Sequence, residues 1–307
     1  MEFTLGLSSP FSLDYTLESG QVFRWENRGE WWCGVVAGGV VKAAQDRDSL
    51  RCVSSGESVG GTFVRSYFGL DEDLQAILAS IVKDNTLAKA AQRFYGMRLV
   101  KQDFWECLAS FVLATNSNIP RIKKMVASIC SRFGESIEFE GTEYFLFPSA
   151  ERLAEAPVVE LKEAGLGYRA AFLRRVADAV AERRVDPNEL AIMDYERARE
   201  VLSTVLRGEK LLPGVGPKVA DCVLLYSCGK DEAFPIDVWV ARGLARSYPQ
   251  LLGPGLAKKF AGNTKAKLSG RIYAQISAAA RLYFGRYAGY AQQYLYMATR
   301  DESLRTS

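Results

Sequence analysis

The sequence predicts an α+β protein, in which a small antiparallel β-sheet domain is followed by a large all-helical region. Within the first sixty or so residues, the runs FTLGLS, WWCGVVA, VVKAA and LRCVSS are typical of strands, and Gly38-Gly39 between the second and third run indicates a hairpin turn. After about Asp71, apolar residues recur every three or four positions, as they do along amphipathic helices. We therefore predict a β-rich N-terminal domain with two helices over residues 1–99 and a helical region over residues 100–307.

The helical segments follow from this periodicity. The two helices of the first domain are expected at residues 73–84 and 86–96. Further helices are expected at residues 103–115, 119–134, 168–184, 195–206, 219–227, 237–248 and 287–300.

Composition narrows the chemistry that the chain can perform. The 307 residues include no histidine, the commonest general base and metal ligand, so catalysis must rest on Lys, Asp, Glu, Tyr or Cys. The six cysteines form no C-x-x-C pair, so free thiols are expected and no metal site is predicted. No secretory leader or membrane span is visible, so we expect an intracellular protein, in the cytoplasm and nucleoid or in a nucleus.

Charge is distributed unevenly along the chain. The net charge is only +3, but Lys258, Lys259, Lys265, Lys267 and Arg271 form a positive stretch without an acid. A second basic group lies at residues 121–124. Such groups suit a phosphate backbone, and a solvated helix face explains each of them equally well.

The segment LLPGVGPKVADC predicts an anion-binding turn. We expect RGEKLL to form a short helix and a second helix to open at Pro217, so that Gly214, Val215 and Gly216 form the turn of a helix–hairpin–helix. Outward-facing N–H groups at such a turn bind a DNA phosphate without reading sequence. Tight glycine turns also occur for packing reasons alone.

Lys218 and Asp237 are the candidate catalytic residues. Lys218 lies beside the positive end of the predicted helix, where a pocket would lower its pKa and leave a nucleophilic amine. The plain alternative is a surface lysine that contacts phosphate. Asp237 in FPIDVWVAR is placed to cap the next helix, and a capping carboxylate is held in one orientation and kept ionised.

Together these residues resemble the 8-oxoguanine DNA glycosylase branch of the helix–hairpin–helix DNA glycosylases. The segments PGVGPKVADC and PIDVWVAR carry the resemblance, and LESGQVFRWE, NSNIPRI, GLGYRAAF and YAGYAQQYLY extend it over nearly the whole chain. It implies two helical subdomains with the active site in the cleft between them. It also implies that the chain acts as a monomer on double-stranded DNA containing oxidised guanine, without cofactor, metal or membrane.

The resemblance assigns a role to each site residue. Lys218 would attack C1′ of the sugar and form a Schiff base that permits β-elimination, while Asp237 would stabilise the oxocarbenium-like transition state. The extruded base would be bound by four residues: Gly20 through its carbonyl to N7–H, Gln292 at the Watson–Crick edge, and Cys222 and Tyr296 on the two faces.

The remaining duplex would be held by a second set of residues. Asn116 would fill the gap, Tyr168 would act as a wedge, and Arg121 and Arg169 would read the orphan cytosine. Without the resemblance, Arg121 and Arg169 are explained as ordinary surface residues, and Asn116 as the end of a helix. The chain departs from the resemblance at two places. Many animal-type relatives have a histidine where this chain has Trp239, and the segment STVLRGEK before the hairpin is longer than the corresponding segment in those relatives.

Two alternatives remain open at this point. One is a glycosylase of the same fold that removes alkylated purines; such enzymes generally use water and lack the lysine. The other is a non-catalytic DNA-binding protein whose hairpin contacts phosphate only, and which would bind DNA with a salt dependence but release no base.

Overall fold

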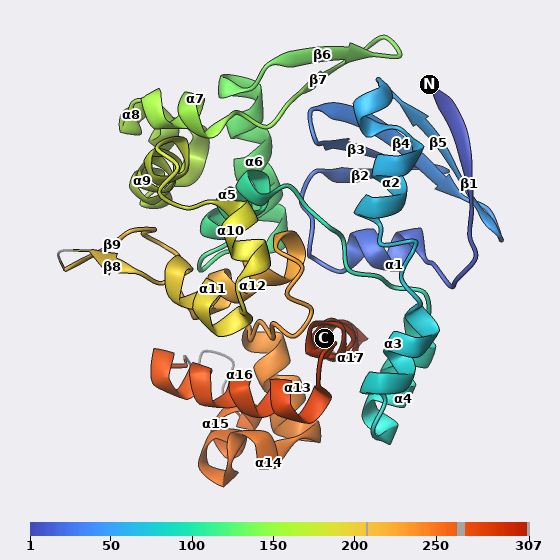
Figure 1. The fold of residues 1–307 in the computed structure, drawn as a ribbon, viewed down its shortest axis with the longest axis vertical. Coiled ribbons are helices and arrows are strands. Elements are labelled where there is room, and N and C mark those ends of the chain that lie inside the picture. The colour runs from blue at the N-terminus through green and yellow to red at the C-terminus, as the bar shows by residue number, and fades with distance from the viewer. Residues whose placement is uncertain (207, 263–267, 306–307) are drawn as a thin grey trace.

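A five-stranded antiparallel sheet forms the N-terminal part of the computed structural model, which describes residues 1–206, 208–262 and 268–305 (Figure 1). The strand order is β1-β5-β4-β3-β2, and every pairing is antiparallel. The strands are β1 (Glu2–Gly6), β2 (Trp25–Arg28), β3 (Trp31–Val36), β4 (Gly39–Gln45) and β5 (Ser49–Ser54). The predicted fold class, a small antiparallel sheet before a helical region, is confirmed.

The hairpin between β3 and β4 turns one residue earlier than the sequence suggested. Ala37 and Gly38 have φ values of 46° and 78°, whereas Gly39 already belongs to β4 and pairs with Val36. Two successive positive φ values are typical of a type I′ hairpin turn. Strand β2 was not predicted, because three of its four residues are exposed and give no apolar alternation.

Residues 1–99 contain four α-helices, where the sequence predicted two. Helices α3 (Leu74–Ile81) and α4 (Asn85–Arg93) are the predicted pair. The two others are α1 (Leu13–Glu18) and α2 (Gly61–Tyr67), with the 3₁₀ turn η1 (Glu57–Val59) before α2. Six and seven residues are fewer than two helical turns, too short for a helical period to be recognised.

The rest of the chain is mainly helical, as predicted (Figure 1). The first group comprises α5 (Phe104–Leu113), α6 (Ile119–Phe133), the ribbon β6 (Ser136–Phe139) and β7 (Thr142–Phe145), α7 (Ala150–Glu155), α8 (Val158–Leu161), η2 (Lys162–Leu166), α9 (Arg169–Ala181), α10 (Pro187–Ile192) and α11 (Tyr195–Leu202). The second comprises β8 (Val205–Leu206), β9 (Glu209–Lys210), α12 (Pro217–Ser227), α13 (Val238–Ser247), α14 (Pro249–Leu252), α15 (Pro254–Gly262), α16 (Gly270–Phe284) and α17 (Ala288–Arg305).

Two hydrophobic cores stabilise the fold. The smaller core lies on the sheet and contains Trp25, Leu50 and Phe68. The larger core runs through the helical region and also includes Leu74 of α3 and Leu87 of α4. Figure 1 shows α3 and α4 beside α17, near the other end of the chain. These two helices, expected with the N-terminal domain, therefore pack into the helical core.

The hairpin before α12 corrects one prediction. RGEKLL does not form a helix: Glu209–Lys210 is strand β9, which pairs with β8. Arg207 lies outside the described residues. The helix that precedes the PGVG turn is α11, which ends at Leu202. The amphipathic period of residues 195–206 therefore stops before the two-stranded ribbon, whose strands contain only two residues each and leave no pattern to recognise.

Candidate active site

A cavity of about 770 Å³ lies between segments that are far apart in the sequence. The loop after α1, the segment after α5, the N-terminal turns of α12 and α13, and α17 all line it. Nine of the predicted site residues share this cavity: Gly20, Asn116, Gly214, Gly216, Lys218, Cys222, Asp237, Gln292 and Tyr296. The fold therefore brings together the residues that were assigned to catalysis and to base binding.

Lys218 is the second residue of α12, which begins at Pro217 as predicted. The N–H of the first residue in a helix has no intrahelical acceptor. Proline, which lacks an N–H, therefore fits this position without the loss of a hydrogen bond. Gly214 in the preceding turn has φ 84°, and a Cβ there would lie 3.1 Å from Phe172, so this position requires glycine. Lys218 Nζ lies 5.0 Å from the centre of the Phe111 ring. The lysine therefore extends along an aromatic wall of the cavity.

Asp237 caps α13, as the sequence predicted. Its Oδ1 accepts hydrogen bonds from the backbone N–H groups of Trp239, at 2.9 Å, and Val240, at 2.8 Å. Burial raises the pKa of Asp237 above its ordinary value, while the positive charge of Lys218 and the two N–H groups oppose that shift. The two hydrogen bonds thus fix the orientation of the Asp237 carboxylate near Lys218. Both bonds use Oδ1, so Oδ2 is not needed for the cap.

Cys222 and Tyr296 supply a thiol and an aromatic ring to the same cavity. Cys222 lies one helical turn after Lys218 and is 2% exposed. Burial raises the pKa of its thiol to about 11, against the opposing charge of Lys218, so the thiol is neutral. Burial likewise raises the pKa of Tyr296 to about 12. Both side chains therefore present uncharged surfaces, which suit the faces of a base.

Gly20 and Gln292 line the cavity with polar groups. Gly20 has φ 77°, and a Cβ added there would lie 3.0 Å from Tyr296 Oη, so the backbone approaches that ring more closely than other residues would allow. Gln292 is 4% exposed, and its Oε1 has no hydrogen-bond partner among the described residues. An unpaired buried amide oxygen that faces a cavity is suited to accept a hydrogen bond from a ligand.

The four residues assigned to the duplex differ in their surroundings. Tyr168 is 51% exposed and Arg169 only 2%, and the Arg169 guanidinium stacks 4.5 Å from the Tyr168 ring centre. Arg169 donates to the carbonyl oxygens of Thr115 and Asn116, and Asn116 Nδ2 lies 3.4 Å from Tyr168 Oη. Arg121 is exposed at the start of α6.

The hairpin residue Val215 has a buried side chain, and its N–H donates to the Leu212 carbonyl at 3.1 Å. Lys210 Nζ donates to the Val215 carbonyl at 2.8 Å, which ties β9 to the turn. Of the basic stretch predicted over residues 258–271, Lys265 and Lys267 lie outside the described residues. All six cysteines are free, as predicted.

Trp239 projects from the first turn of α13 and lines the cavity. The guanidinium of Arg242, one turn later, stacks 4.7 Å from its ring centre. This arrangement places an aromatic surface and a positive charge beside Asp237.

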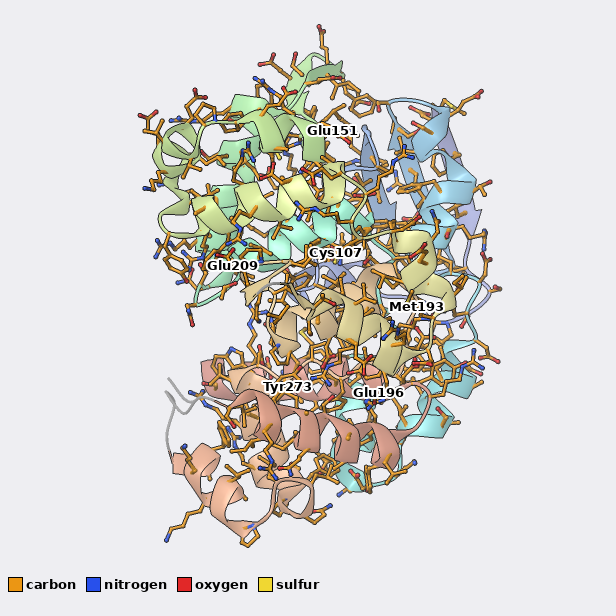
Figure 2. All side chains as sticks on the ribbon, turned by 60° about the vertical axis from the view of Figure 1, so that its left-hand side comes forward. Cys107, Glu151, Met193, Glu196, Glu209 and Tyr273 are labelled. Atoms are coloured by element: carbon orange, nitrogen blue, oxygen red, sulfur yellow. The ribbon has the colours of Figure 1, made fainter. Side chains whose placement is uncertain are left out.

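Sequence reasoning missed Phe111, Gln293 and Tyr273. All three line the cavity, and Tyr273 extends from α16 (labelled in Figure 2). Tyr273 Oη donates to Asp221 Oδ2 at 2.7 Å and accepts from the Ile236 N–H at 3.0 Å. Phe111 and Tyr273 follow the apolar period of core helices, so no pattern distinguished them. The second glutamine of YAQQYLY, a polar residue at a buried helical position, was the one available signal.

No helix within the described ranges is long and apolar enough to cross a membrane.

Comparisons with known proteins identify the family to which the chain is similar. Residues 5–108 match the N-terminal domain of 8-oxoguanine DNA glycosylase, and residues 109–250 match the HhH-GPD superfamily of base excision DNA repair proteins. The chain is 30% identical to an N-glycosylase/DNA lyase of Arabidopsis thaliana, over 94% of this chain and 77% of the relative. It is 33% identical to the N-glycosylase/DNA lyase of Saccharomyces cerevisiae, over 78% and 69%.

A solved structure extends the similarity to the fold. The 8-oxoguanine glycosylase/lyase of Clostridium acetobutylicum, in complex with double-stranded DNA containing cytosine opposite 8-oxoguanine, superposes with a TM-score of 0.83. Sequence identity is 26%, and the superposition covers 98% of each chain. Sequence identity and shared fold thus point to one group of proteins: this chain belongs to the 8-oxoguanine DNA glycosylase family, within the HhH-GPD superfamily of base excision DNA repair proteins.

Proposed function

We propose that the protein is a bifunctional DNA glycosylase/lyase that excises 8-oxoguanine from duplex DNA and then nicks the strand at the resulting site. The observation that carries the proposal is the shared cavity, in which an amine, a fixed carboxylate and an unpaired amide oxygen line one space of about 770 Å³. A base inside a duplex is out of reach, so it must be extruded into such a cavity before its glycosidic bond is cut.

The chemistry follows from the amine. Lys218 Nζ gives up a proton and forms a bond to C1′ while the bond from C1′ to N9 breaks, and the base leaves with the bonding electrons and takes up a proton. The sugar ring then opens to an imine between Nζ and C1′. Loss of the C2′ proton expels the 3′ phosphate by β-elimination, and water later hydrolyses the imine to free the lysine.

Asp237 stabilises the positive charge that develops on the sugar as the bond to the base lengthens. Its orientation is already fixed by the two N–H groups of α13, so no reorganisation is needed when that charge forms. This role needs a carboxylate and no histidine, in keeping with a chain that has none.

Base recognition is assigned to four cavity residues. The Gly20 carbonyl accepts from N7–H of 8-oxoguanine, where guanine has a lone pair, a difference on the order of 1–3 kcal/mol. Gln292 binds the Watson–Crick edge, which would satisfy its unpaired Oε1. Cys222 and Tyr296 contact the two faces of the base.

The partner is double-stranded DNA with cytosine as the preferred opposite base. Asn116 fills the gap and Tyr168 acts as the wedge, while Arg121 and Arg169 contact the orphan cytosine. Gly214 and Gly216 of the turn bind the phosphate backbone. Val215, which was predicted to share this role, is buried and its N–H is already bound to the Leu212 carbonyl. The protein acts as a monomer, in the cytoplasm and nucleoid or in a nucleus, where its DNA substrate lies.

Borohydride trapping tests this proposal. The wild-type protein, incubated with a duplex containing 8-oxoguanine opposite cytosine and reduced with borohydride, should form a covalent adduct that Lys218→Gln does not form. Release of 8-oxoguanine without an adduct would instead identify a glycosylase that uses water in place of the lysine. Release of an alkylated purine but not of 8-oxoguanine from a matched duplex would identify the alkylated-purine alternative. DNA binding without base release would identify a non-catalytic binding protein. Rates with each of the four opposite bases test the cytosine preference.

A further inference from the structure

Two adjacent glutamines on α17 have different surroundings. Gln292 leaves its Oε1 unpaired at the cavity, whereas both ends of the Gln293 amide are engaged. Gln293 Nε2 donates to the Ser19 carbonyl at 2.7 Å, and Gln293 Oε1 accepts from Tyr226 Oη at 2.7 Å. A carbonyl only accepts, so the contact with Ser19 fixes which end of the amide carries the nitrogen.

The bond from Gln293 acts on the peptide unit that immediately precedes Gly20. On the other side of Gly20, Gln21 is held through its side chain, which donates to the Thr16 and Arg98 carbonyls at 3.0 and 2.8 Å. The Gln21 carbonyl accepts from Gln102 Nε2 at 2.9 Å. Gly20 is therefore fixed from both directions, although glycine itself has the widest conformational freedom.

Gln293 also connects this loop with the wall beside the nucleophile. The Tyr226 ring, whose hydroxyl binds Gln293, stacks on Phe111 with an interplanar angle of 15° and a centroid distance of 5.7 Å. Lys218 Nζ lies 5.0 Å from the centre of the same Phe111 ring. Because the stacking on Phe111 holds the Tyr226 ring, the Tyr226 hydroxyl is a fixed donor to Gln293 Oε1.

We propose that Gln293 is a positioning residue for lesion recognition, which orients the Ser19–Gly20 backbone so that the Gly20 carbonyl meets N7–H of the extruded base. This inference rests on the proposed function, and it assigns adjacent glutamines two tasks: Gln292 contacts the base, and Gln293 acts through Gly20. Part of the discrimination between 8-oxoguanine and guanine then depends on Gln293, a side chain that does not touch the substrate.

Abasic DNA separates positioning from general damage to the site. Gln293→Met keeps the size and shape of the side chain but removes both hydrogen bonds. The variant should excise 8-oxoguanine roughly ten-fold more slowly. This is the effect expected when one hydrogen bond, that between the Gly20 carbonyl and N7–H of the base, is lost. Incision of a ready-made abasic site needs Lys218 but no base, so its rate should stay within about two-fold of wild type. Tyr226→Phe, which removes only the partner of Oε1, should show a smaller change in the same direction.

Thr299→Val is the matched control. Thr299 is 3% exposed on the same helix, and its Oγ1 donates only within α17, to the Leu295 carbonyl at 2.8 Å. It should leave the ratio of the two rates unchanged. Wild-type 8-oxoguanine excision by Gln293→Met, or equal loss of both activities, would overturn the proposal.

Amide hydrogen exchange provides a readout that does not depend on the substrate. The segment that contains Ser19, Gly20 and Gln21 should exchange faster in Gln293→Met than in wild type, and should be unchanged in Thr299→Val. Unchanged exchange in Gln293→Met would overturn the inference. A wild-type protein that releases no 8-oxoguanine would instead refute the proposed function, whatever the exchange data show.

Discussion

The hydroxyl of Tyr273 joins two parts of the active site by donating to Asp221 Oδ2 at 2.7 Å. The same oxygen accepts from the N–H of Ile236, the residue before Asp237. Asp221 belongs to α12, three residues after Lys218. The tyrosine therefore connects the helix of the nucleophile with the segment that presents the carboxylate.

Tyr273→Phe should weaken both the fold and the site. The change leaves the buried Ile236 N–H without its acceptor, at a cost of roughly 1–3 kcal/mol. Thermal unfolding should show a lower Tm, and single-turnover base release should slow because Asp237 is less firmly placed. An unchanged rate together with a lower Tm would limit Tyr273 to a structural role.

The Asp221 carboxyl should make stability depend on pH. Burial raises its pKa from 3.8 to about 6, while Arg199, the hydroxyls of Tyr195 and Tyr273, and Arg281 oppose the rise. Between these two values the folded state holds a proton that the unfolded state has lost, so this group's contribution to stability falls as pH rises from about 4 to about 6 and is constant above. Asp221→Asn should flatten the dependence of Tm on pH over that range. An equally steep profile in the variant would contradict the assignment.

Asp237→Asn should separate catalysis from stability. Asparagine caps a helix as well as aspartate does, so Tm should change little, and DNA binding should persist. Turnover should fall roughly a hundred-fold or more, because no carboxylate remains to stabilise the sugar cation. Single-turnover rates and binding isotherms measure the two effects, and unchanged turnover would reduce Asp237 to a helix cap.

The pH dependence of base release should report the same carboxylate. Because burial raises the pKa of Asp237, the ionised form is lost as pH falls through a value above the ordinary 3.8 for aspartate. The wild-type rate should therefore decline toward acid pH. The residual rate of Asp237→Asn should lack this limb, and a limb of the same shape in the variant would assign it to another group.

Arg169→Ala and Arg121→Ala form an informative pair. Arg169 is buried and donates to the carbonyls of Thr115 and Asn116, on either side of the bend at Asn116, whose φ is 50°. The loss of its side chain should therefore lower the free energy of unfolding by about 2–3 kcal/mol. It should also weaken the preference for cytosine. Arg121 is exposed, so its loss should change stability by less than about 0.5 kcal/mol. Equal Tm values for the two variants would contradict this distinction.

Local sequence patterns determined much of the fold and of the cavity. The start of α12 at Pro217 and the cap at Asp237 were predictable because both depend on a few adjacent residues. The ribbon β8–β9 and helices α1 and α2 were not, because two to seven residues carry no resolvable period. The sequence also did not show that Arg169 is buried and holds the Thr115 carbonyl, because this contact joins residues more than fifty positions apart in the chain.

The place of α17 in the chain has a consequence for biosynthesis. This helix supplies Gln292, Gln293 and Tyr296, yet it follows every other segment that lines the cavity. A nascent chain in which Lys218 has been synthesised but α17 has not therefore lacks part of the cavity for a damaged base. Excision of a base therefore has to wait until α17 has been synthesised and has folded against the earlier segments.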